Sequence, residues 1–543
     1  MIRDIAELEN GSTINAQVGI VGAGLAGLDA ARFLARHGLR VVVLESGRRE
    51  FDPEIQKLTR VESVGKPLRT PDPKGPHNPY LPPMFRGEGR LRQLGGTANI
   101  WTGKWREFDA LDFEARAWVP ESGWPISLDE LRPTYREIER DYAFGDFQAF
   151  ADNEGYRRLC RETAPAGLQP GFHYWEGETT RPAQRYRAEL EASPNLVIVL
   201  GASATELLLD HRGERVESVM CRSLDGHWLT LAADHIMVAA GGLETPRLLL
   251  ASTSRFPEGI GNKHDLVGRF YTDHPKVKGG KLYPGRNFGL IPGGAAFFPR
   301  PRFQVSFTLS REEQRRFSLL NHAVFLSPAD SSADPGIQAL AAAWRKRDIK
   351  RLLWRAASIE ASPMAVLAAV REKLALKTGA SRDVYKAALC VEQAPNPSSR
   401  VYLGTERDGL GMPRLVVDWR FTERDHESFR TTLHKLAKAL EAAGIGRLEF
   451  GSRPPTLDDT TDANHPMGAT RMGATPASGV VDRDCKVFGI DNLFVASSSV
   501  FPTGHSVAPT LTIIALARRA SARILKLSRP VVLNQRMARA VVR

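Results

Sequence analysis

The chain has 543 residues, of which 42% are hydrophobic and 25% are charged, and its formal net charge is +12. This length exceeds what one hydrophobic core usually supports, so two domains or one large interleaved fold are expected. The lysines and arginines are spread along the whole chain and form no basic block interleaved with aromatic residues, which argues against a nucleic-acid partner.

The cysteines and the first residues of the chain bear on its compartment. Cys160, Cys221, Cys390 and Cys485 are far apart and show no CxxC or Cys/His ligand spacing, so we expect neither disulfides nor a metal site. The stretch "MIRDIAELENGSTINAQ" is polar where an export signal would be apolar, and no apolar run approaches the length of a membrane span. We therefore expect a cytoplasmic protein in a reducing compartment.

The clearest motif lies at 18–47, "VGIVGAGLAGLDAARFLARHGLRVVVLESG". It predicts a buried strand, a GxGxxG turn, a helix and a second strand that ends in an acid. Such glycines permit a tight turn and let backbone N–H groups approach a pyrophosphate, while the acid accepts hydrogen bonds from ribose hydroxyls. The motif fits FAD or NAD equally. The residues expected to contact the dinucleotide are Gly22, Gly24, Leu25, Ala26, Gly27, Glu45 and Ser46.

Units of a similar kind recur along the chain. Residues 91–140 contain a Gly-Gly turn with small polar residues, 235–252 predict a strand, a Gly-Gly turn and a helix, and 492–504 predict a strand that enters a small-residue turn. We therefore expect an α/β chain, with a Rossmann-type domain built from discontinuous segments and an inserted substrate domain that contains an antiparallel sheet. The expected limits are 1–150, 190–285 and 455–543 for the first domain, and 151–189 and 286–454 for the second.

A basic amphipathic stretch, "WRKRDIKRLLWRA", lies at 344–356. Its pattern predicts a helix, and the ordinary interpretation is a solvated helix face of a large domain. The alternative is a surface that docks on a membrane or on a partner protein.

One of the thirteen histidines has the surroundings of a catalytic base. His465 lies in "ANHPMGATRMG", a turn of small residues that lets a substrate approach closely, and an imidazole suits removal of a hydroxyl proton near neutral pH. A structural histidine bonded to a nearby carbonyl is the alternative. We expect His274, in "YTDHP", to be structural, and we expect Glu392 and Gln393 to face either the cleft or solvent.

Ordered motifs over about residues 15–527 resemble the glucose–methanol–choline (GMC) oxidoreductase family, most of all its bacterial sugar and polyol dehydrogenases. They are "GGTANIWTG", "GWPISLDEL", "VAAGGLETPRLLLAS", "VGRFYTDHP", "EQAPNPSSRV", "HPMGATRMG" and "VASSSVFPTG". The resemblance implies FAD as the cofactor and His465 as the base or the hydrogen-bond partner of the substrate hydroxyl. Beyond the first motif, it implies that the cofactor contacts Gly95, Gly96, Asn99, Ile100, Trp101, Ala204, Ala240, Gly241, Ser497, Ala508 and Thr510.

The chain departs from the family pattern at two positions. Ile100 stands where some relatives have a histidine bonded covalently to the flavin, so we expect FAD to be held noncovalently. Ala508 stands immediately before Pro509, where the family has an Asn or His that holds the substrate oxygen. Losing such a hydrogen bond in a buried site costs about 1–3 kcal/mol. His505 is a candidate to take the vacant place as a catalytic residue, and the alternative is a histidine that only lines the turn.

The resemblance implies oxidation of a hydroxyl group on a sugar, polyol, aminocyclitol or other natural product, by hydride transfer to flavin N5 with His465 as base. Oxygen or a quinone-like molecule would accept the electrons, and the chain would be a monomer or homodimer. Two alternatives stay open. One is a flavoenzyme retuned at Ala508 for another reaction on a bulky metabolite. The other is a flavin-bearing electron-transfer or scaffold subunit that docks through 344–356, with peripheral membrane contact.

Overall fold

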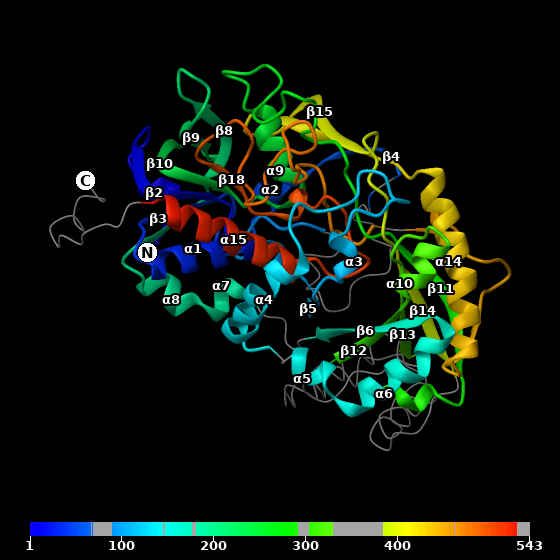
Figure 1. Ribbon diagram of the computed structural model, residues 1–543. Helices are drawn as coiled ribbons and strands as arrows, with labels where there is room; N and C mark the ends of the chain where they lie inside the picture. The colour runs from blue at the N-terminus through cyan, green and yellow to red at the C-terminus, as the bar shows by residue number, and fades with distance from the viewer. Residues whose placement is uncertain are drawn as a thin grey trace, which may run out of the picture.

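The computed structural model of the chain describes residues 1–66, 68, 89–101, 103–144, 147–175, 181–291, 303–328, 384–460 and 462–528. The basic stretch at 344–356 lies outside the described residues. The described elements build two large sheets and one small sheet. In Figure 1 the strands of the first large sheet lie at the upper left and those of the second at the lower right.

The first sheet has the strand order β1-β7-β3-β2-β10-β9-β8, and β18 pairs with β10. The pairs along β1, β7, β3, β2 and β10 are parallel, as is the β10–β18 pair, whereas β8 and β9 are antiparallel additions. The strands are β1 (Ile2–Asp4), β2 (Thr13–Val21), β3 (Val41–Glu45), β7 (Leu196–Leu200), β8 (Ser203–Leu209), β9 (Val216–Arg222), β10 (Trp228–Val238) and β18 (Leu493–Val495). Segments from both ends of the chain thus share one sheet, which confirms the predicted Rossmann-type fold built from discontinuous segments.

Two helices lie side by side across one face of this sheet (Figure 1). They are α1 (Leu25–Arg36) and α15 (Thr510–Leu527). They pack closely because small or apolar side chains, such as Ala30 and Ala517, are fully buried between them and the strands. Both helices begin at the edge where the parallel strands end.

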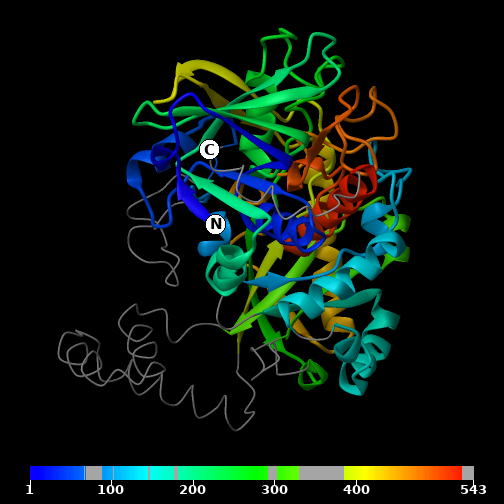
Figure 2. The same cartoon turned by 90° about the vertical axis from the view of Figure 1, so that its left-hand side faces the viewer.

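The second sheet has the order β17-β11-β14-β13-β12-β6-β5, and every pair in it is antiparallel. This confirms the predicted antiparallel sheet, which lies below the first sheet in the view of Figure 2. Its strands are β5 (Lys104–Trp105), β6 (Leu168–Trp175), β11 (Lys276–Pro284), β12 (Phe303–Leu309), β13 (Ala323–Pro328), β14 (Tyr385–Cys390) and β17 (Gly446–Glu449). β5 and β11 belong to this sheet although they fall outside 151–189 and 286–454. The domain limits themselves stay a prediction.

One face of the second sheet is packed against α14 (Glu423–Ala442). Alternate strand residues such as Val305, Phe307 and Leu389 are buried there with Phe429 and Leu436 of the helix. Side chains alternate between the two faces of a strand, so the residues between them, which include Gln304 and Ser306, belong to the opposite face. That opposite face is polar.

The remaining elements complete the described fold. A small sheet contains β4 (Glu62–Gly65), β15 (Arg400–Arg407) and β16 (Pro413–Trp419). The other helices are α2 (Pro53–Gln56), α3 (Ala110–Phe113), α4 (Leu128–Tyr142), α5 (Phe147–Ala151), α6 (Glu154–Thr163), α7 (Pro182–Arg185), α8 (Arg187–Ala192), α9 (Gly241–Ala251) and α10 (Arg311–Arg316).

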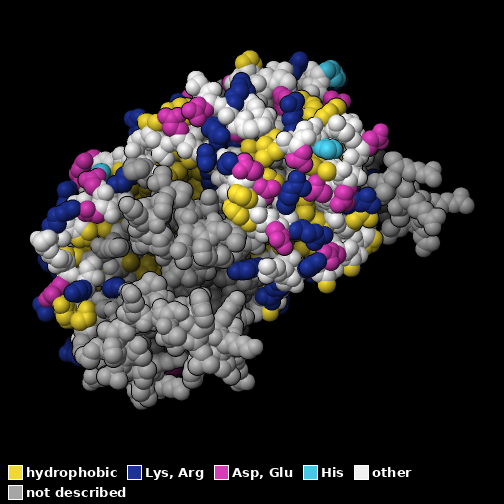
Figure 3. Space-filling model, turned by 180° about the vertical axis from the view of Figure 1, so that it is seen from behind, with side chains coloured by type: hydrophobic (Ala, Val, Ile, Leu, Met, Phe, Trp, Pro, Cys, Tyr) yellow, Lys and Arg dark blue, Asp and Glu magenta, His cyan; other side chains and the backbone are white. Residues whose placement is uncertain are grey.

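The described surface carries charges of both signs. On the face shown in Figure 3, lysine and arginine side chains are interspersed with aspartates and glutamates. Within the described part of the chain, none of the helices combines the length and the apolar character that crossing a bilayer requires.

Candidate active site

The glycines of the first motif leave a space in front of α1. Gly22 has φ +103°, and a Cβ there would lie 2.7 Å from the Ala239 carbonyl oxygen, while a Cβ on Gly27 would lie 1.9 Å from the Gly22 oxygen. Gly24 differs, because a Cβ there would meet no protein atom within 4 Å. The first and third glycines therefore serve the tight turn and the close helix packing, and the second leaves room for a pyrophosphate at the helix N-terminus.

Glu45, the last residue of β3, holds the same turn. Its Oε2 accepts a hydrogen bond from the Ala23 N–H (2.8 Å), and its Oε1 accepts one from the Gly47 N–H (2.7 Å). Burial raises the pKa of the Glu45 carboxyl, although these two hydrogen bonds oppose the shift. The side chain is thus placed beside the glycine turn, next to Ser46, and its contact with a ribose stays a prediction.

The motif "GGTANIWTG", which starts at Gly95 and holds several predicted cofactor contacts, packs directly on the glycine turn. The Gly95 N–H donates to the Ala23 oxygen (2.9 Å), and a Cβ on Gly96 would lie 2.9 Å from the Gly24 Cα. Asn99 donates through Nδ2 to the Leu94 oxygen (2.9 Å), which closes the loop on itself. At its end, Ile100 is buried and the half-buried Trp101 meets Trp105 edge to face with ring centroids 5.0 Å apart.

The other predicted cofactor residues gather at one edge of the parallel sheet. β2, β3, β7, β10 and β18 all end there, so the residues that follow these strands meet at the edge where open α/β sheets bind ligands. Gly241, the first residue of α9, has φ +79° and also faces open space. The predicted residues that follow these strands within a few positions are Ala204, Ala240, Gly241 and Ser497, whereas Ala508 and Thr510 lie just before and at the start of α15. This cradle fits a dinucleotide.

His465 lies against a second histidine. Its Nδ1 is 3.0 Å from the Nδ1 of His274, although 191 residues separate the two in the chain. Thr272 and Met467 exchange two backbone hydrogen bonds (3.1 and 2.9 Å), which join the two segments. Asp273 adds to this link, because its carboxylate accepts hydrogen bonds from the backbone N–H groups of both histidines (2.6 Å from His274 and 2.9 Å from His465).

The electrostatics of this pair keep both rings neutral. Burial lowers the pKa of His465 to about 3, and the positive charges of Lys276 and Lys104 contribute to the shift. Burial also lowers the pKa of His274 well below its usual value, and His465 is the next contributor. Two neutral imidazoles bond through their Nδ1 atoms only if one donates and the other accepts, so the two tautomers are linked.

The other ring nitrogen of His274 points to the loop before α15. This Nε2 is buried and has no hydrogen-bond partner among the described residues. A Cβ built on Gly504 would lie 3.6 Å from it. A buried polar atom without a partner is costly, so this nitrogen is a candidate contact for a bound molecule.

His505 is held by two carboxylates. Its Nε2 lies 3.1 Å from Asp109 Oδ2 and 2.9 Å from Asp112 Oδ2, and its Nδ1 lies 3.3 Å from the Ser506 hydroxyl. Burial alone would lower the pKa of His505, but the two carboxylates outweigh it and raise the pKa to about 9. The ring is therefore a buried cation at neutral pH. Its assignment as a catalytic residue stays a prediction, as does the vacancy beside the half-buried Ala508.

The ligand atoms of Asp109, Asp112 and His505 all lie within 4.8 Å of one another, a spacing that suits a cation. Both carboxylates already have partners, however. Arg106 donates to Asp109 (3.1 Å), and Asn321 Nδ2 donates to Asp112 Oδ1 (3.0 Å). With two cationic side chains at this cluster, we interpret it as an ion-pair network.

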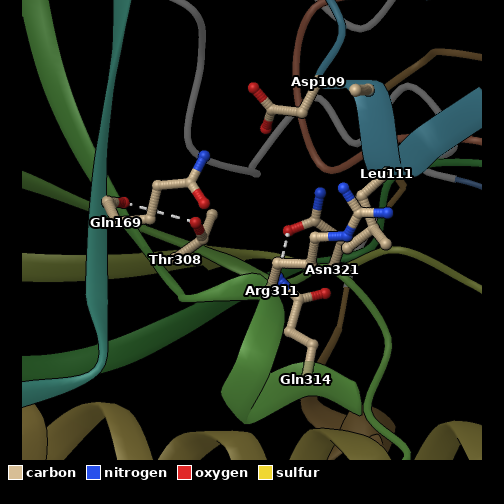
Figure 4. Close-up of a pocket in the computed structure, with 8 residues that line it drawn as sticks. Asp109, Leu111, Gln169, Thr308, Arg311, Gln314 and Asn321 are labelled. Atoms are coloured by element: carbon tan, nitrogen blue, oxygen red, sulfur yellow. Dashed lines mark hydrogen bonds between the residues drawn. The ribbon is translucent and has the colours of Figure 1, made fainter. Parts of the chain in front are cut away.

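A small cavity lies beside Asp109, which is one of the residues that line it (Figure 4). Its volume is about 240 Å³, which is below the usual range for ligand pockets of about 300–1,000 Å³. Arg311 at its wall is already paired with Glu114. None of the predicted cofactor residues lines it; the lining residues are Asp109, Ala110, Leu111, Gln169, Thr308, Arg311, Gln314 and Asn321. The cavity therefore gives no reason to move the predicted site away from His465.

Some sequence expectations differ from the observed contacts. Glu392 and Gln393 face neither an open cleft nor solvent. Glu392 is fully buried and paired with Arg116 (2.8 Å), and Gln393 accepts a hydrogen bond from Trp419 (2.8 Å). Sequence reasoning also missed the polar sheet face opposite α14, although the alternation in "FQVSF" (303–307) was a usable signal.

Family models and known proteins agree on the relationship of the chain. Two models described as GMC oxidoreductase match residues 105–276 and 395–517, together more than half of the chain, and a model described as an NAD(P)-binding Rossmann-like domain matches 20–50. The fructose dehydrogenase large subunit of Gluconobacter japonicus is 24% identical, over 94% of this chain and 98% of its own. The 2-methyl-1,2-propanediol dehydrogenase of Mycolicibacterium austroafricanum is 25% identical, over 92% and 93%.

Another relative is the 6'''-hydroxyparomomycin C oxidase of Streptomyces lividus, which is 25% identical over 92% of this chain and 90% of its own. Among solved structures, pyridoxine 4-oxidase from Mesorbium loti has a TM-score of 0.57 at 21% identity and covers 94% of this chain and 99% of its own. Formate oxidase of Aspergillus oryzae, in a structure concerned with FAD modification, has a TM-score of 0.52 at 18% identity, over 96% and 99%. These two structures share the fold.

Proposed function

We propose that this chain, which belongs to the GMC oxidoreductase family, oxidises a hydroxyl group of a small molecule with His465 as the base. FAD is the cofactor, and when bound it supplies the acceptor, flavin N5, for the hydride that leaves the carbinol carbon. The observation that carries the proposal is the 3.0 Å contact between the Nδ1 atoms of His465 and His274.

This contact decides which nitrogen of His465 is free. If His274 accepts at Nδ1, then His465 carries its proton on Nδ1 and presents an unprotonated Nε2, which is the atom that takes the hydroxyl proton. If His274 donated instead, Nε2 of His465 would carry the proton and would be no base. The proposed arrangement therefore requires the Nε2–H tautomer of His274, whose Nε2 is the buried atom without a hydrogen-bond partner among the described residues.

His274 then acts as a positioning residue. When His465 takes up the proton it becomes an imidazolium, and its Nδ1–H bond to the neutral His274 becomes charge-assisted and stronger. A hydrogen bond that strengthens as the proton is transferred favours the transition state over the ground state. The three backbone hydrogen bonds on Asp273, from residues 274, 463 and 465, hold this geometry in place.

The last helix supports the cofactor half of the site. α15 begins at Thr510, with Pro509 as the residue before it, and its N-terminus has no side-chain cap. The first N–H groups of an 18-residue helix therefore offer uncapped donors and a partial positive charge. We propose that these donors stabilise negative charge on the bound cofactor.

We propose that His505 supports the loop before α15 and makes no contact with the substrate. Contact with the substrate oxygen would require its Nε2 to leave two carboxylates in a buried site, and breaking such ion pairs is costly. Ala508 leaves the substrate oxygen with one protein partner fewer, so we assign that oxygen to His465.

The substrate class comes from the relatives. Their printed names describe oxidation or dehydrogenation of fructose, 2-methyl-1,2-propanediol and a hydroxylated paromomycin. By analogy we propose a sugar, polyol or aminocyclitol hydroxyl as the group oxidised here.

Anaerobic mixing of the FAD-loaded enzyme with candidate alcohols tests the proposal. A substrate should bleach the oxidised flavin absorbance, and His465→Ala should keep its FAD yet reduce it about 10²–10⁴-fold more slowly, the usual contribution of a general base. His211→Ala, at an exposed histidine of the first-sheet region, is the matched control. If His465→Ala reduces its flavin at the wild-type rate, the assignment of the base is wrong.

A further inference from the structure

The second sheet presents one polar face, and strand register decides which residues share it. Directly paired residues lie on the same side of a sheet, as do residues two apart in a strand. The register joins side chains of neighbouring strands on this face: Lys104 of β5 pairs with Trp175 of β6, His173 of β6 with Gln304 of β12, and Ser306 of β12 with Phe325 of β13. The pairs Ala323–Cys390 and Lys276–Cys390 extend it to β14 and β11. We call this set the polar face: Lys104, His173, Gln304, Ser306, Phe325, Cys390 and Lys276.

Two lysines stand at opposite sides of the polar face. Lys104, on the edge strand β5, reaches across β6. Its Nζ donates to Gln304 Oε1 of β12 (3.0 Å) and lies 5.6 Å from the ring centre of Phe325 on β13. Lys276 begins β11 on the far side, two residues after His274. Among the described residues neither ammonium group forms an ion pair with a carboxylate. The acid nearest to Lys276 in the sequence is Asp273, whose carboxylate accepts hydrogen bonds from three backbone N–H groups.

The polar face adjoins the histidine pair, because Lys276 at the start of β11 follows His274 by two residues. The charges of Lys276 and Lys104 both act on His465, and that of Lys276 acts on His274 as well. Burial lowers the pKa of Lys104 to about 8, and the like charge of Lys276 lowers it further, so the two ammonium groups also act on each other. Lys104 is half-buried and Lys276 is exposed, and two like charges without a counter-charge oppose each other.

A buried and unpaired ring nitrogen lies on the same face. Nδ1 of His173 has no hydrogen-bond partner among the described residues, and the side chain is 1% exposed. Like Nε2 of His274, it is a buried ring nitrogen without a hydrogen-bond partner in the described part of the chain. Together the lysines and the two ring nitrogens form a set of groups that suits a polar, negatively charged molecule.

We propose that the substrate carries an anionic group, a carboxylate or a phosphate, which Lys104 and Lys276 bind while its hydroxyl lies at His465. The proposal rests on the proposed function and names the substrate class of that site. An anion between the half-buried Lys104 and the exposed Lys276 would form charge-assisted hydrogen bonds and offset the repulsion between the two ammonium groups. A neutral sugar of the same size offers no such compensation.

The same contact links binding to catalysis. In the free enzyme the lysine charges oppose protonation of His465, which weakens it as a base. An anion bound at the lysines cancels part of that charge, so His465 binds a proton more readily in the complex. By reciprocity, a protonated His465 binds the anion more tightly than a neutral one. His465 is then a strong enough base only when a substrate occupies the site at the two lysines.

Matched substrates test the proposal with the FAD-loaded enzyme. Gluconate and glucose 6-phosphate are each compared with glucose, and glycerol 3-phosphate is compared with glycerol, in anaerobic flavin reduction. We expect kcat/KM to be at least tenfold higher for an anionic member of a pair, and the carboxylate and phosphate arms identify which anion fits. Equal values within every pair that reacts overturn the inference while the proposed function stands. If no alcohol of either kind reduces the flavin, the proposed function fails, and the inference fails with it.

Variants and a binding readout complete the test. In Lys104→Gln and Lys276→Gln the ratio of anionic to neutral kcat/KM should fall at least tenfold, whereas Lys57→Gln, at an exposed lysine paired with Glu54, should leave it unchanged. Titration of the oxidised holoenzyme with inorganic phosphate or acetate should perturb the flavin absorbance, and both glutamine variants should weaken that binding. This second readout needs no turnover and applies even if a variant is inactive. Unchanged ratios together with unchanged anion binding overturn the lysine assignment.

Discussion

Replacing His274 tests whether the histidine pair acts as a unit. His274→Ala removes the acceptor of the His465 Nδ1–H bond, which the structure places at 3.0 Å in a buried site. A hydrogen bond to a charged group contributes about 1.5–3 kcal/mol, and His465 is charged after proton transfer. Since each 1.4 kcal/mol corresponds to tenfold in rate, flavin reduction should slow by about 10–100-fold.

The pH dependence separates this role from a structural one. Without the acceptor, the protonated form of His465 is less stable, so the base should titrate at a lower pH and the plateau rate should fall. His274→Asn is the matched variant, because its amide oxygen accepts the Nδ1–H bond and should restore part of the rate. FAD content and thermal unfolding serve as controls for folding. A His274→Ala enzyme with the wild-type rate and pH profile would refute the reasoning.

Three other predictions concern the cofactor cradle and the loop before α15. Gly24→Ala should fold normally, because the new Cβ meets no protein atom within 4 Å. It should bind FAD at least tenfold more weakly, because the Cβ enters the space in front of α1. Equilibrium titration of the apoprotein with FAD measures the affinity, and an unchanged affinity would contradict the prediction. The pKa of His505 is about 9 in the fold and about 6.5 in the unfolded chain, so its contribution to stability is present below pH 6.5 and lost as the pH rises through 9. Thermal unfolding measured against pH should show this loss of stability in the wild type. The loss should be absent in His505→Gln. Ala508→Asn should speed flavin reduction by restoring a partner for the substrate oxygen, by about tenfold for one hydrogen bond, and a slower variant would count against the proposed vacancy.

The nucleotide half of the site could be predicted from the sequence because its signal is local. The strand, the three glycines, the helix and Glu45 lie within thirty residues, and each has a physical reason that does not depend on the rest of the chain. A Cβ on Gly22 or Gly27 would clash with backbone atoms, whereas Gly24 faces open space, and their contacts with the cofactor stay a prediction. The discontinuous fold followed from the same kind of unit near both ends.

The other half could not be predicted, because its contacts join distant segments. His274 and His465 meet only through the pairing of Thr272 with Met467, and neither histidine has a local sign of the other. His505 lies three residues before Ala508 in the sequence, yet its carboxylate partners lie almost four hundred residues earlier. Glu392 is predicted to face the cleft or solvent, but it pairs with Arg116, 276 residues away, and both side chains are fully buried.

The polar face of the second sheet shows the same limit. Lys104 and Lys276 stand on edge and inner strands that are far apart in the sequence, and only the strand order brings them to one side of one sheet. Alternation within a single strand predicts that a polar face exists. It does not predict which strands adjoin it or that the histidine pair borders it.

The most direct test of the account is the rate of anaerobic flavin reduction by an alcohol substrate, measured against pH in the wild type and in His465→Gln. We predict that the wild-type rate rises with pH to a plateau as the base loses its proton, and that His465→Gln retains FAD but loses at least two powers of ten in rate and the pH dependence of that base. A His465→Gln enzyme that keeps both the rate and the pH profile would contradict the central claim.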